Sequence, residues 1–344
     1  MTQEEADDLY IDFVKNTYEA IRVSAQNPSQ FVLFFGAGAS YGSDNSRLVK
    51  SRQLPPLGKD LYTYLSRNIN TKYWKTLPLK LKTLFNEDFE QALKFLMDND
   101  ETYNLFYKLL LELAFYFAEF KVTNDSLYFK FAQRLYQKKT KISIISLNYD
   151  HLLQDALSLN QVMPTTLGVH RNDLHGEFKN FIPVDVIYPH GASQFSFYFP
   201  KEWEHEIYRD KAEIMGPGVW QFYEIKNMLI NYIKLPNKPQ SMPLMCAYEP
   251  GKRPFSENDF IQMQQIYYEQ TILLAKRIVL VGVNCNNKND RHLWASLEKT
   301  KAEIIFIEPS DSSISEIEKW NPNAKIIQKT FKDGFNDICE LVSL

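Results

Sequence analysis

Glycine and cysteine are both rare in this sequence. Its 344 residues include 12 glycines and 3 cysteines, whereas glycine usually makes up about 7% of a protein. The cysteines, Cys246, Cys285 and Cys339, lie far apart, so their spacing fits neither a disulfide framework nor a metal-binding knuckle. This excludes a disulfide-stapled secreted protein, and we expect a cytoplasmic one.

The sequence also lacks a surplus of charge of either sign and any long hydrophobic run. Its 39 basic and 42 acidic residues give a net charge of −3, so we predict no direct nucleic-acid binding. The most apolar stretch, residues 109–120, is interrupted by Glu112 and Glu119 and is too short to cross a bilayer. The first ten residues are acidic, unlike a signal peptide. We therefore predict no membrane association.

Short runs of β-favouring apolar residues recur along the chain. They cover residues 31–35, 142–147, 184–188, 278–281 and 303–307, with a further possible run at 244–248. Runs that are apolar on both faces, with helical stretches between them, are typical of parallel sheets covered by helices on each side. The sequence therefore predicts an α/β fold, a Rossmann-like, doubly wound and mostly parallel sheet.

Helical periodicity divides the rest of the chain. Residues 8–26 read as an amphipathic helix, so we expect an N-terminal helical segment over 1–30 and one large domain over 31–344. The first two predicted strands are separated by far more residues than one crossover needs. We predict a helical insertion over about 59–136, with helices near 89–96, 106–120 and 128–136. A smaller helical insertion is expected over about 203–235.

Several of the few glycines follow the first predicted strand. A strand that ends in Gly-x-Gly, as at Gly36 and Gly38, can offer backbone N–H groups to a phosphate. Tyr41 stands where a third glycine would complete the dinucleotide fingerprint. Residues 38–42 also match Gly-x-Ser-x-Gly, the nucleophile elbow of α/β hydrolases, with Ser40 as nucleophile. A turn that needs glycine only for its geometry is the third alternative.

Polar residues also follow the second and third predicted strands. Asn148 and Asp150 come after the run at 142–147, where α/β folds place ligand contacts. Either residue could instead cap the helix that begins near residue 151. His190, next to Gly191, follows the third strand and is a possible general base at neutral pH. A lone histidine of this kind is more often structural.

The last two predicted strands end in residues that suit a nucleotide. Gly282 and Asn284 follow the run at 278–281, and Glu308 follows the run at 303–307. An acid in that place could bind ribose hydroxyls, or it could simply end the strand. His170 and His175 have no third ligand at a metal-binding spacing, and we predict no metal site.

In their order along the chain, these motifs resemble the sirtuin family. The matching pieces are Gly-Ala-Gly-Ala-Ser at 36–40, Leu-Pro-Pro-Leu-Gly at 54–58, Ser-x-Asn-Tyr-Asp at 146–150, His190-Gly191, Gly282 with Asp290 downstream, and the acidic strand end at 303–308. The resemblance implies NAD as substrate and a role for each matching position. Gly36, Ala37, Gly38 and Ser40 would bind its diphosphate, and Gly282, Asn284 and Glu308 would line the adenosine side. Asn148 and Asp150 would contact nicotinamide and its ribose, and His190 would be the catalytic base.

The departures from the sirtuin pattern narrow the expected activity. Leu147 and Tyr149 stand where sirtuin deacylases usually have Gln and Ile, and three dispersed cysteines cannot build their four-cysteine zinc ribbon. The chain resembles the bacterial branch without the ribbon, whose members are NADases of antiphage defence. That branch implies NAD+ hydrolysis to ADP-ribose and nicotinamide, no zinc, and a regulatory partner such as a HerA-type ATPase or an Argonaute-like protein. The aromatic-rich insertion also suggests a homo-oligomer.

Two other functions are compatible with these residues. One is an NAD-dependent protein deacylase or ADP-ribosyltransferase, which would use the same NAD-binding residues on an acylated or nucleophilic acceptor. The other is a module that senses NAD or ADP-ribose and assembles without cleaving it.

Overall fold

The computed structural model describes nine stretches of the chain, residues 29–43, 47–48, 54–68, 71–166, 182–198, 219–221, 241–245, 259–285 and 290–344. The helix expected over residues 8–26 lies outside them. Of the range 203–235, the described part is Val219–Gln221, which forms a strand. No helix in the described part of the chain is long and apolar enough to span a membrane.

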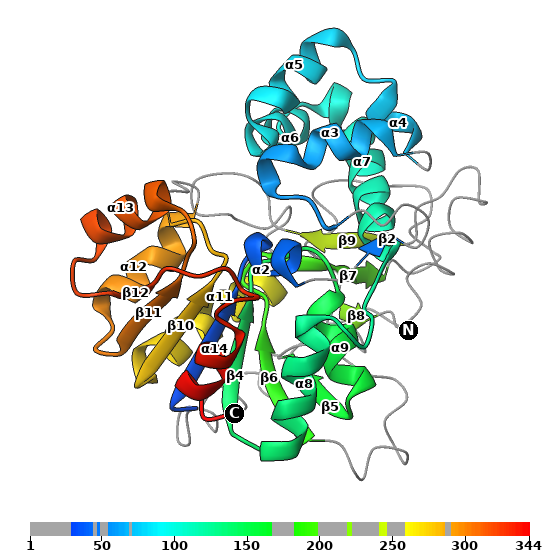
Figure 1. Ribbon diagram of the computed structural model, residues 1–344. Helices are drawn as coiled ribbons and strands as arrows, with labels where there is room; N and C mark the ends of the chain where they lie inside the picture. The colour runs from blue at the N-terminus through cyan, green and yellow to red at the C-terminus, as the bar shows by residue number, and fades with distance from the viewer. Residues whose placement is uncertain are drawn as a thin grey trace, which may run out of the picture.

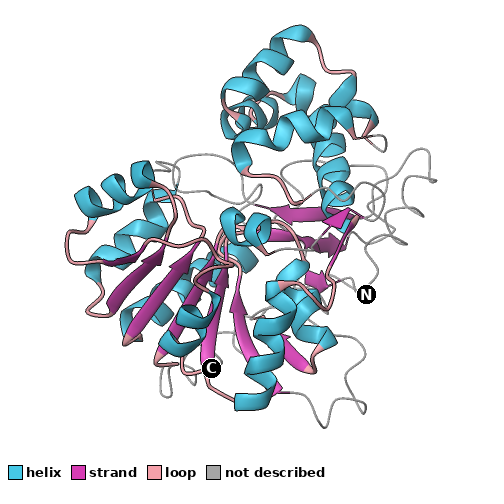
Figure 2. Ribbon diagram, viewed as in Figure 1, coloured by secondary structure: helices cyan, strands magenta, loops and turns pink. Residues whose placement is uncertain are grey.

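A sheet of seven parallel strands forms the centre of the fold (Figures 1 and 2). Its order is β12-β11-β10-β1-β4-β6-β5, and each neighbouring pair is parallel. The strands are β1 (Phe31–Phe35), β4 (Ile142–Ser146), β5 (Val162–Thr165), β6 (Ile182–Ile187), β10 (Arg277–Val281), β11 (Glu303–Ile307) and β12 (Lys325–Ile327). This confirms the predicted α/β class and the five strands that carried the prediction.

Two strands of this sheet were not predicted, and both lie at its edges. β5 includes Pro164, and its residues alternate between buried and partly buried positions. β12 has no fully buried residue. Edge strands need not be apolar on both faces, so neither produces the continuous apolar run that identifies a central parallel strand.

A second, small sheet is antiparallel. It has the order β8-β7-β9 and consists of β7 (Gly191–Tyr198), β8 (Val219–Gln221) and β9 (Ser241–Met245). The possible sixth strand predicted over residues 244–248 therefore begins earlier, at Ser241, and belongs to this sheet instead of the parallel one. A two-stranded pairing of β2 (Arg47–Leu48) with β3 (Phe120–Lys121) completes the described sheets.

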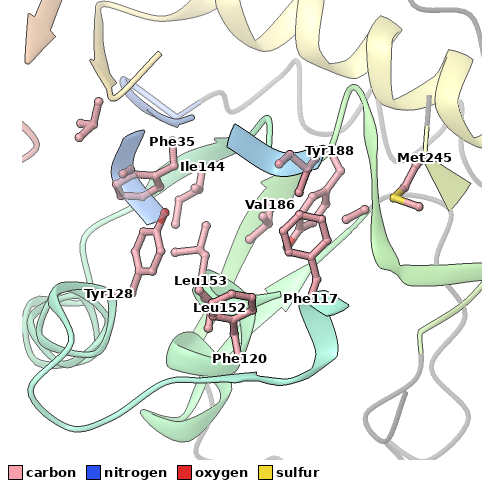
Figure 3. Close-up of a cluster of buried hydrophobic side chains, with 14 of the residues drawn as sticks. Phe35, Phe117, Phe120, Tyr128, Ile144, Leu152, Leu153, Val186, Tyr188 and Met245 are labelled. Carbon is pink, nitrogen blue, oxygen red and sulfur yellow. The ribbon is translucent and has the colours of Figure 1, made fainter. Parts of the chain in front are cut away.

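Helices cover both faces of the parallel sheet. Val32 and Phe34 of β1 pack against α11 (Asp259–Leu274), α12 (Arg291–Lys299) and α13 (Asp311–Trp320). Leu33 and Phe35 face the other way, toward α8 (Leu127–Lys138), α9 (Leu152–Leu159) and α14 (Phe335–Leu341). Figure 3 shows Phe35 and Tyr128 side by side in this second layer. Their ring centroids are 5.2 Å apart. The alternation along β1 is the two-sided burial that a parallel sheet requires.

The segment between β1 and β4 is mostly helical. Some of its helices stand beyond the end of the parallel sheet, whereas its last helix, α8, packs on the sheet. Its helices are α2 (Ala37–Gly42), the 3-10 turn Gly58–Asp60, α3 (Leu61–Arg67), α4 (Lys72–Lys75), α5 (Leu79–Glu87), α6 (Phe89–Met97), α7 (Asp100–Ala118) and α8. Helices α3 to α6 stand beyond the end of the sheet, and α7 runs from them to the small sheet, where it contacts β7 and β9 (Figure 1). Because α8 packs against Phe35, it is the crossover helix between β1 and β4.

The winding of the chain reverses between β1 and β10. The connection from β1 returns through α8 on one face, whereas the connection from β10 returns through α12 on the other. In open parallel sheets, ligands bind beyond the carboxyl ends of the strands at such a reversal. The residues that follow Phe35 and Val281 therefore mark the place where a site is expected.

Candidate active site

The loops that follow β1 and β10 touch through their backbones at the reversal point. Gly36 N donates a hydrogen bond to Val281 O over 3.0 Å, and Gly38 N donates to Gly282 O over 3.0 Å. A Cβ on Gly36 would lie 2.4 Å from Gly282 O, and one on Gly282 would lie 2.3 Å from Ala39 N. Gly282 also has φ +62°, which side chains disfavour. This contact requires glycine on both loops.

The contact changes the interpretation of the Gly-x-Gly motif. The amides of Gly36 and Gly38 are already used within the fold, so both glycines serve close packing of the two strand ends. Ala37 is exposed as the first residue of α2, and Ser40, one turn later, is buried. That Gly36, Ala37, Gly38 and Ser40 bind a diphosphate stays a prediction. Of the four, Ala37 is the one that is exposed to solvent.

Ser40 and Asn148 meet behind the glycine contact. Asn148 Nδ2 lies 2.9 Å from Ser40 Oγ and 3.4 Å from the Tyr128 hydroxyl, which is itself 3.1 Å from Ser40 Oγ. All three side chains are buried. They come from α2, α8 and the end of β4. The direction of the Asn148 side chain follows from the alternation of side chains along an extended strand. Leu147 packs toward the α12 face, so the next side chain points toward α8.

The hydrogen bonds of this cluster bear on two predictions. Ser40 Oγ contacts a tyrosine and an asparagine, and no histidine bonds to it among the described residues, which disfavours the nucleophile elbow. Asn148 Oδ1 is buried and has no partner among the described residues. A buried amide oxygen left unpaired costs free energy unless something else binds it. Asn148 is therefore suited to hold a hydroxyl or water of a ligand.

Ser43 fixes Tyr128 relative to Ser40. Its backbone carbonyl accepts from Leu127 N at 2.9 Å, and its hydroxyl lies 3.0 Å from Ser126 Oγ. The residue after α2 is thus tied to the first turn of α8. Burial, followed by the charge of Asp150, raises the pKa of Tyr128 well above its usual value, so its hydroxyl stays protonated.

Asp150 both caps a helix and carries a buried carboxyl group. Its Oδ1 accepts the Leu152 N–H at 3.1 Å, as the capping alternative predicted. Burial raises the pKa of Asp150, while a hydrogen bond from Ser40 and the neighbouring His151 act in the opposite direction. The carboxyl group therefore belongs to the same buried polar cluster as Ser40 and Asn148.

His190 lies in a tight turn between β6 and β7. Gly191 has φ 68° and donates its N–H to Tyr188 O at 2.9 Å, which closes the turn. The imidazole is 2% exposed, and its Nε2 lies 3.2 Å from Oδ1 of Asp290. Ser193 N donates to Tyr149 O at 2.9 Å, so this turn is tied to the loop that holds Asn148.

The two remaining predicted residues stand apart from this cluster. Glu308 follows β11, which β10 separates from β1. Its Oε1 accepts the Ser310 N–H at 2.9 Å, and burial raises its pKa. Asn284 is exposed, two residues after Gly282. Both lie on the β10–β11 side of the reversal point.

Sequence reasoning assigned no role to two residues of this region, Tyr128 and Asp290. Tyr128 lies on the apolar face of α8, and nothing in the sequence around it indicates that its hydroxyl meets Ser40. Asp290 matched the sirtuin order without a function. No group of three or more His, Cys, Asp or Glu side chains able to hold a metal occurs among the described residues.

Solved structures similar to this chain are sirtuins. No protein-family model matches the sequence, and no curated protein matches it either. A structure reported on the basis of sirtuin substrate affinity shares 12% identity, with 92% of this chain and 95% of that chain covered and a TM-score of 0.46. One reported on the mechanism and regulation of Sir2 enzymes shares 13%, with 95% and 96% covered and a TM-score of 0.46. A Sir2 homolog in complex with NAD shares 12%, with 95% and 93% covered and a TM-score of 0.40.

Substituting Gly282 tests the contact between the two loops. We expect Gly282→Ala to lower the free energy of unfolding by about 2 kcal/mol or more, because its Cβ meets backbone atoms that cannot move aside and φ is positive. Gly58→Ala is the matched control, since a Cβ there meets nothing within 4 Å, and it should change stability by less than about 0.5 kcal/mol. Equal unfolding curves for the two variants in urea would contradict the assigned contact.

Asp150 should make the stability of the protein depend on pH. Its pKa is raised in the folded state, so protonation favours folding, and this contribution is lost as pH rises through the folded pKa. Asp150→Asn keeps an acceptor for Leu152 N–H but removes the buried charge. We expect the variant to melt at a higher temperature than the wild type at pH 7, with the difference shrinking toward about pH 4. The exposed Asp125 supplies the control Asp125→Asn. A lower melting temperature for Asp150→Asn at pH 7 would oppose this assignment.

Proposed function

We propose that the protein is an NAD+ glycohydrolase, which cleaves NAD+ to nicotinamide and ADP-ribose. The observation that carries the proposal is the buried cluster of Ser40, Asn148 and Asp150 beside the glycine contact, at the carboxyl ends of β1 and β4. The cluster includes an amide oxygen, Asn148 Oδ1, with no partner among the described residues. These are the residues that the sirtuin-like motif order assigns to the reacting end of NAD.

The reaction requires a nucleophile, a leaving group and a proton acceptor. A water molecule held by Asn148 Oδ1 would attack C1′ of the nicotinamide ribose, and its oxygen would form the new bond. The bond from C1′ to the pyridinium nitrogen breaks, and its electron pair leaves with nicotinamide. The proton of the attacking water passes to His190 as general base, a contribution typically worth about 10² to 10⁴-fold.

The electrostatics of the cluster suit an electron-deficient sugar. Positive charge develops at C1′ as the glycosidic bond breaks, and a carboxylate in a buried site stabilises it more strongly than one in water. In our proposal Asp150 supplies that charge, and the Leu152 N–H holds its Oδ1 in position. Ser40 and Tyr128 would fix the amide group of Asn148, so that its oxygen points to one place.

The remaining part of NAD would extend along the reversal point. In our proposal the diphosphate passes the exposed start of α2 at Ala37, and the adenosine half lies toward Gly282, Asn284 and Glu308. The Glu308 carboxyl at the end of β11 would accept hydrogen bonds from ribose hydroxyls, as acids do at that position in other nucleotide-binding sheets. This places the two halves of NAD on opposite sides of the contact between Gly36 and Gly282.

We further propose that the protein acts in bacterial antiphage defence by depleting cellular NAD+, controlled by a partner such as a HerA-type ATPase or an Argonaute-like protein. The support is the resemblance to the sirtuin-like branch without a zinc ribbon. An unregulated NADase would harm its own cell, so a low basal rate is expected. Adding that partner should raise the rate of nicotinamide release.

Asn148→Ala tests the site. We expect at least about 100-fold slower nicotinamide release, because the variant loses the group that orients the nucleophile. Asn160→Ala is the matched control: this asparagine bonds to Ala156 O and Phe129 O at the end of α9 and should leave the rate within about twofold. Nicotinamide is quantified by chromatography, with and without the partner. Undiminished activity in Asn148→Ala would refute the site, and turnover that requires an acyl-lysine peptide would indicate a deacylase.

We also propose a homo-oligomer, but the aromatic insertion gives it less support than its composition suggested. Most of its rings are buried within the chain, among them Phe106, Tyr116, Phe117, Phe120, Tyr128 and Phe131. Among the described residues of this module, the large apolar side chains that are exposed are Tyr64, Leu79 and Phe95. We expect light scattering after size-exclusion chromatography to give a mass above the 40.4 kDa of one chain. A strict monomer would contradict this.

A further inference from the structure

Gln154 is a buried residue of α9 that bonds to both sides of the turn carrying His190. Its Oε1 accepts two hydrogen bonds, one from the Tyr188 hydroxyl at 3.2 Å and one from Nε2 of Gln194 at 2.8 Å. The three residues are between 1% and 5% exposed. Tyr188 precedes His190 in the chain, and Gln194 follows it on β7. One amide oxygen on α9 therefore holds the turn from both sides.

β7 departs from regular pairing at the place where it meets α9. Its register against β9 shifts between Ala192 and Ser196, which lie opposite neighbouring residues of β9, so the residues between them bulge out. Within this bulge, Ser193 N donates to Tyr149 O at 2.9 Å, and Gln194 reaches α9. Bulges often occur next to active sites, where they redirect side chains. This bulge directs two consecutive residues to the loop and helix that follow β4.

Hydrogen bonds thus join the segment after β4 to the turn after β6 at two places. Two of them end on the Gln154 side chain, and a third ends on the backbone of Tyr149, the residue after Asn148. The helix that carries Gln154 is itself capped by Asp150. The positions of Asn148 and Asp150 relative to His190 therefore depend on these bonds.

We propose that Gln154 is a positioning residue that fixes the distance between Asn148 and His190 for NAD+ cleavage. The inference rests on the proposed function, in which a water held by Asn148 attacks C1′ of the nicotinamide ribose. The water oxygen forms the new bond, the electron pair of the broken bond leaves with nicotinamide, and the proton goes to His190. Such a transfer requires that donor and acceptor stay within hydrogen-bond distance. Gln154 acts through the backbone that it holds.

Stability alone would not favour this buried network. Burying amide and hydroxyl groups costs free energy that their hydrogen bonds offset only in part. Gln194 Oε1 adds to this cost, because it is buried without a partner among the described residues. Apolar side chains of similar size in all three places would leave no polar group unpaired and can be nearly neutral for stability. They would not supply directional bonds, and those bonds are what fix the turn.

The first test is the kinetics of Gln154→Met. We expect kcat to fall about 10 to 100-fold with less than about a twofold change in KM for NAD+, because the substitution displaces the base without removing a substrate contact. Gln154→Glu keeps an oxygen that accepts from both donors, so it should retain more of kcat than Gln154→Met. Gln262→Met, at an exposed glutamine of α11, is the matched control and should leave kcat within about twofold.

A combined variant separates positioning from stability. Gln154→Met, Tyr188→Phe and Gln194→Met together remove every polar group of the network and keep the ring that packs on Phe195, whose centroid lies 5.0 Å from that of Tyr188. We expect the melting temperature of this variant to lie closer to the wild type than that of Gln154→Met alone, because no buried donor is left unpaired. Its kcat should remain about 10-fold or more below the wild type, since the directional bonds are still missing.

The second test needs no substrate turnover. Amide hydrogen exchange, followed by NMR without NAD+, reports on the two backbone bonds of this region, from Gly191 N to Tyr188 O and from Ser193 N to Tyr149 O. Both amides should lose about 10-fold or more of their protection in Gln154→Met and in the combined variant. The Leu147 amide, which is bound to a carbonyl of β1, is the internal reference and should keep its protection. Gln262→Met should change none of them.

The outcomes separate this inference from the proposed function. If the wild type releases no nicotinamide but the two amides lose protection as expected, Gln154 holds the turn and the NADase proposal fails. If nicotinamide is released and Gln154→Met leaves kcat or the amide exchange unchanged, the positioning role is overturned. Recovery of kcat together with the melting temperature in the combined variant would also overturn it, because the network would then be structural only.

Discussion

The backbone contact between Gly36, Gly38 and Gly282 is the constraint on which the site depends. It joins the ends of β1 and β10, the two strands at which the chain reverses its winding. Because the atoms in contact are backbone atoms, no side-chain rearrangement can make room for a Cβ. The start of α2, which carries Ser40, is positioned by this contact.

The catalytic groups of the proposal reach the sheet edge from both faces. Ser40, Tyr128 and Asn148 meet on the face covered by α8. His190 stands in a turn that is bound to α11 on the other face. The hydrogen bond from Ser193 N to Tyr149 O joins the loops that carry Asn148 and His190. In the proposed reaction, the water held at Asn148 would pass its proton to His190, and this backbone hydrogen bond ties together the two loops that carry them.

The strands and site residues that could be predicted from the sequence are those marked by a pattern of neighbouring residues. The central strands could be predicted because β1 and β4 are buried on both faces, and their carboxyl ends placed Ser40 and Asn148 at one edge of the sheet. The edge strands β5 and β12 could not, since solvent on one side removes the apolar run. Tyr128 meets Ser40 across 88 residues of sequence, and no periodicity records such a contact. The roles of Gly36 and Gly38 were predicted for a ligand, whereas their amides bind the neighbouring loop.

Burial of the carboxyl groups in this site has opposite effects on the stability of the fold and on the proposed reaction. The folded protein disfavours the charged forms of Asp150 and Glu308, because burial raises the pKa of each carboxyl group. Apolar or amide side chains would suit these positions better if only stability mattered. Low dielectric is, however, what makes a fixed carboxylate effective against developing positive charge. The same burial that weakens the fold at Asp150 would therefore strengthen its interaction with the sugar as the glycosidic bond breaks.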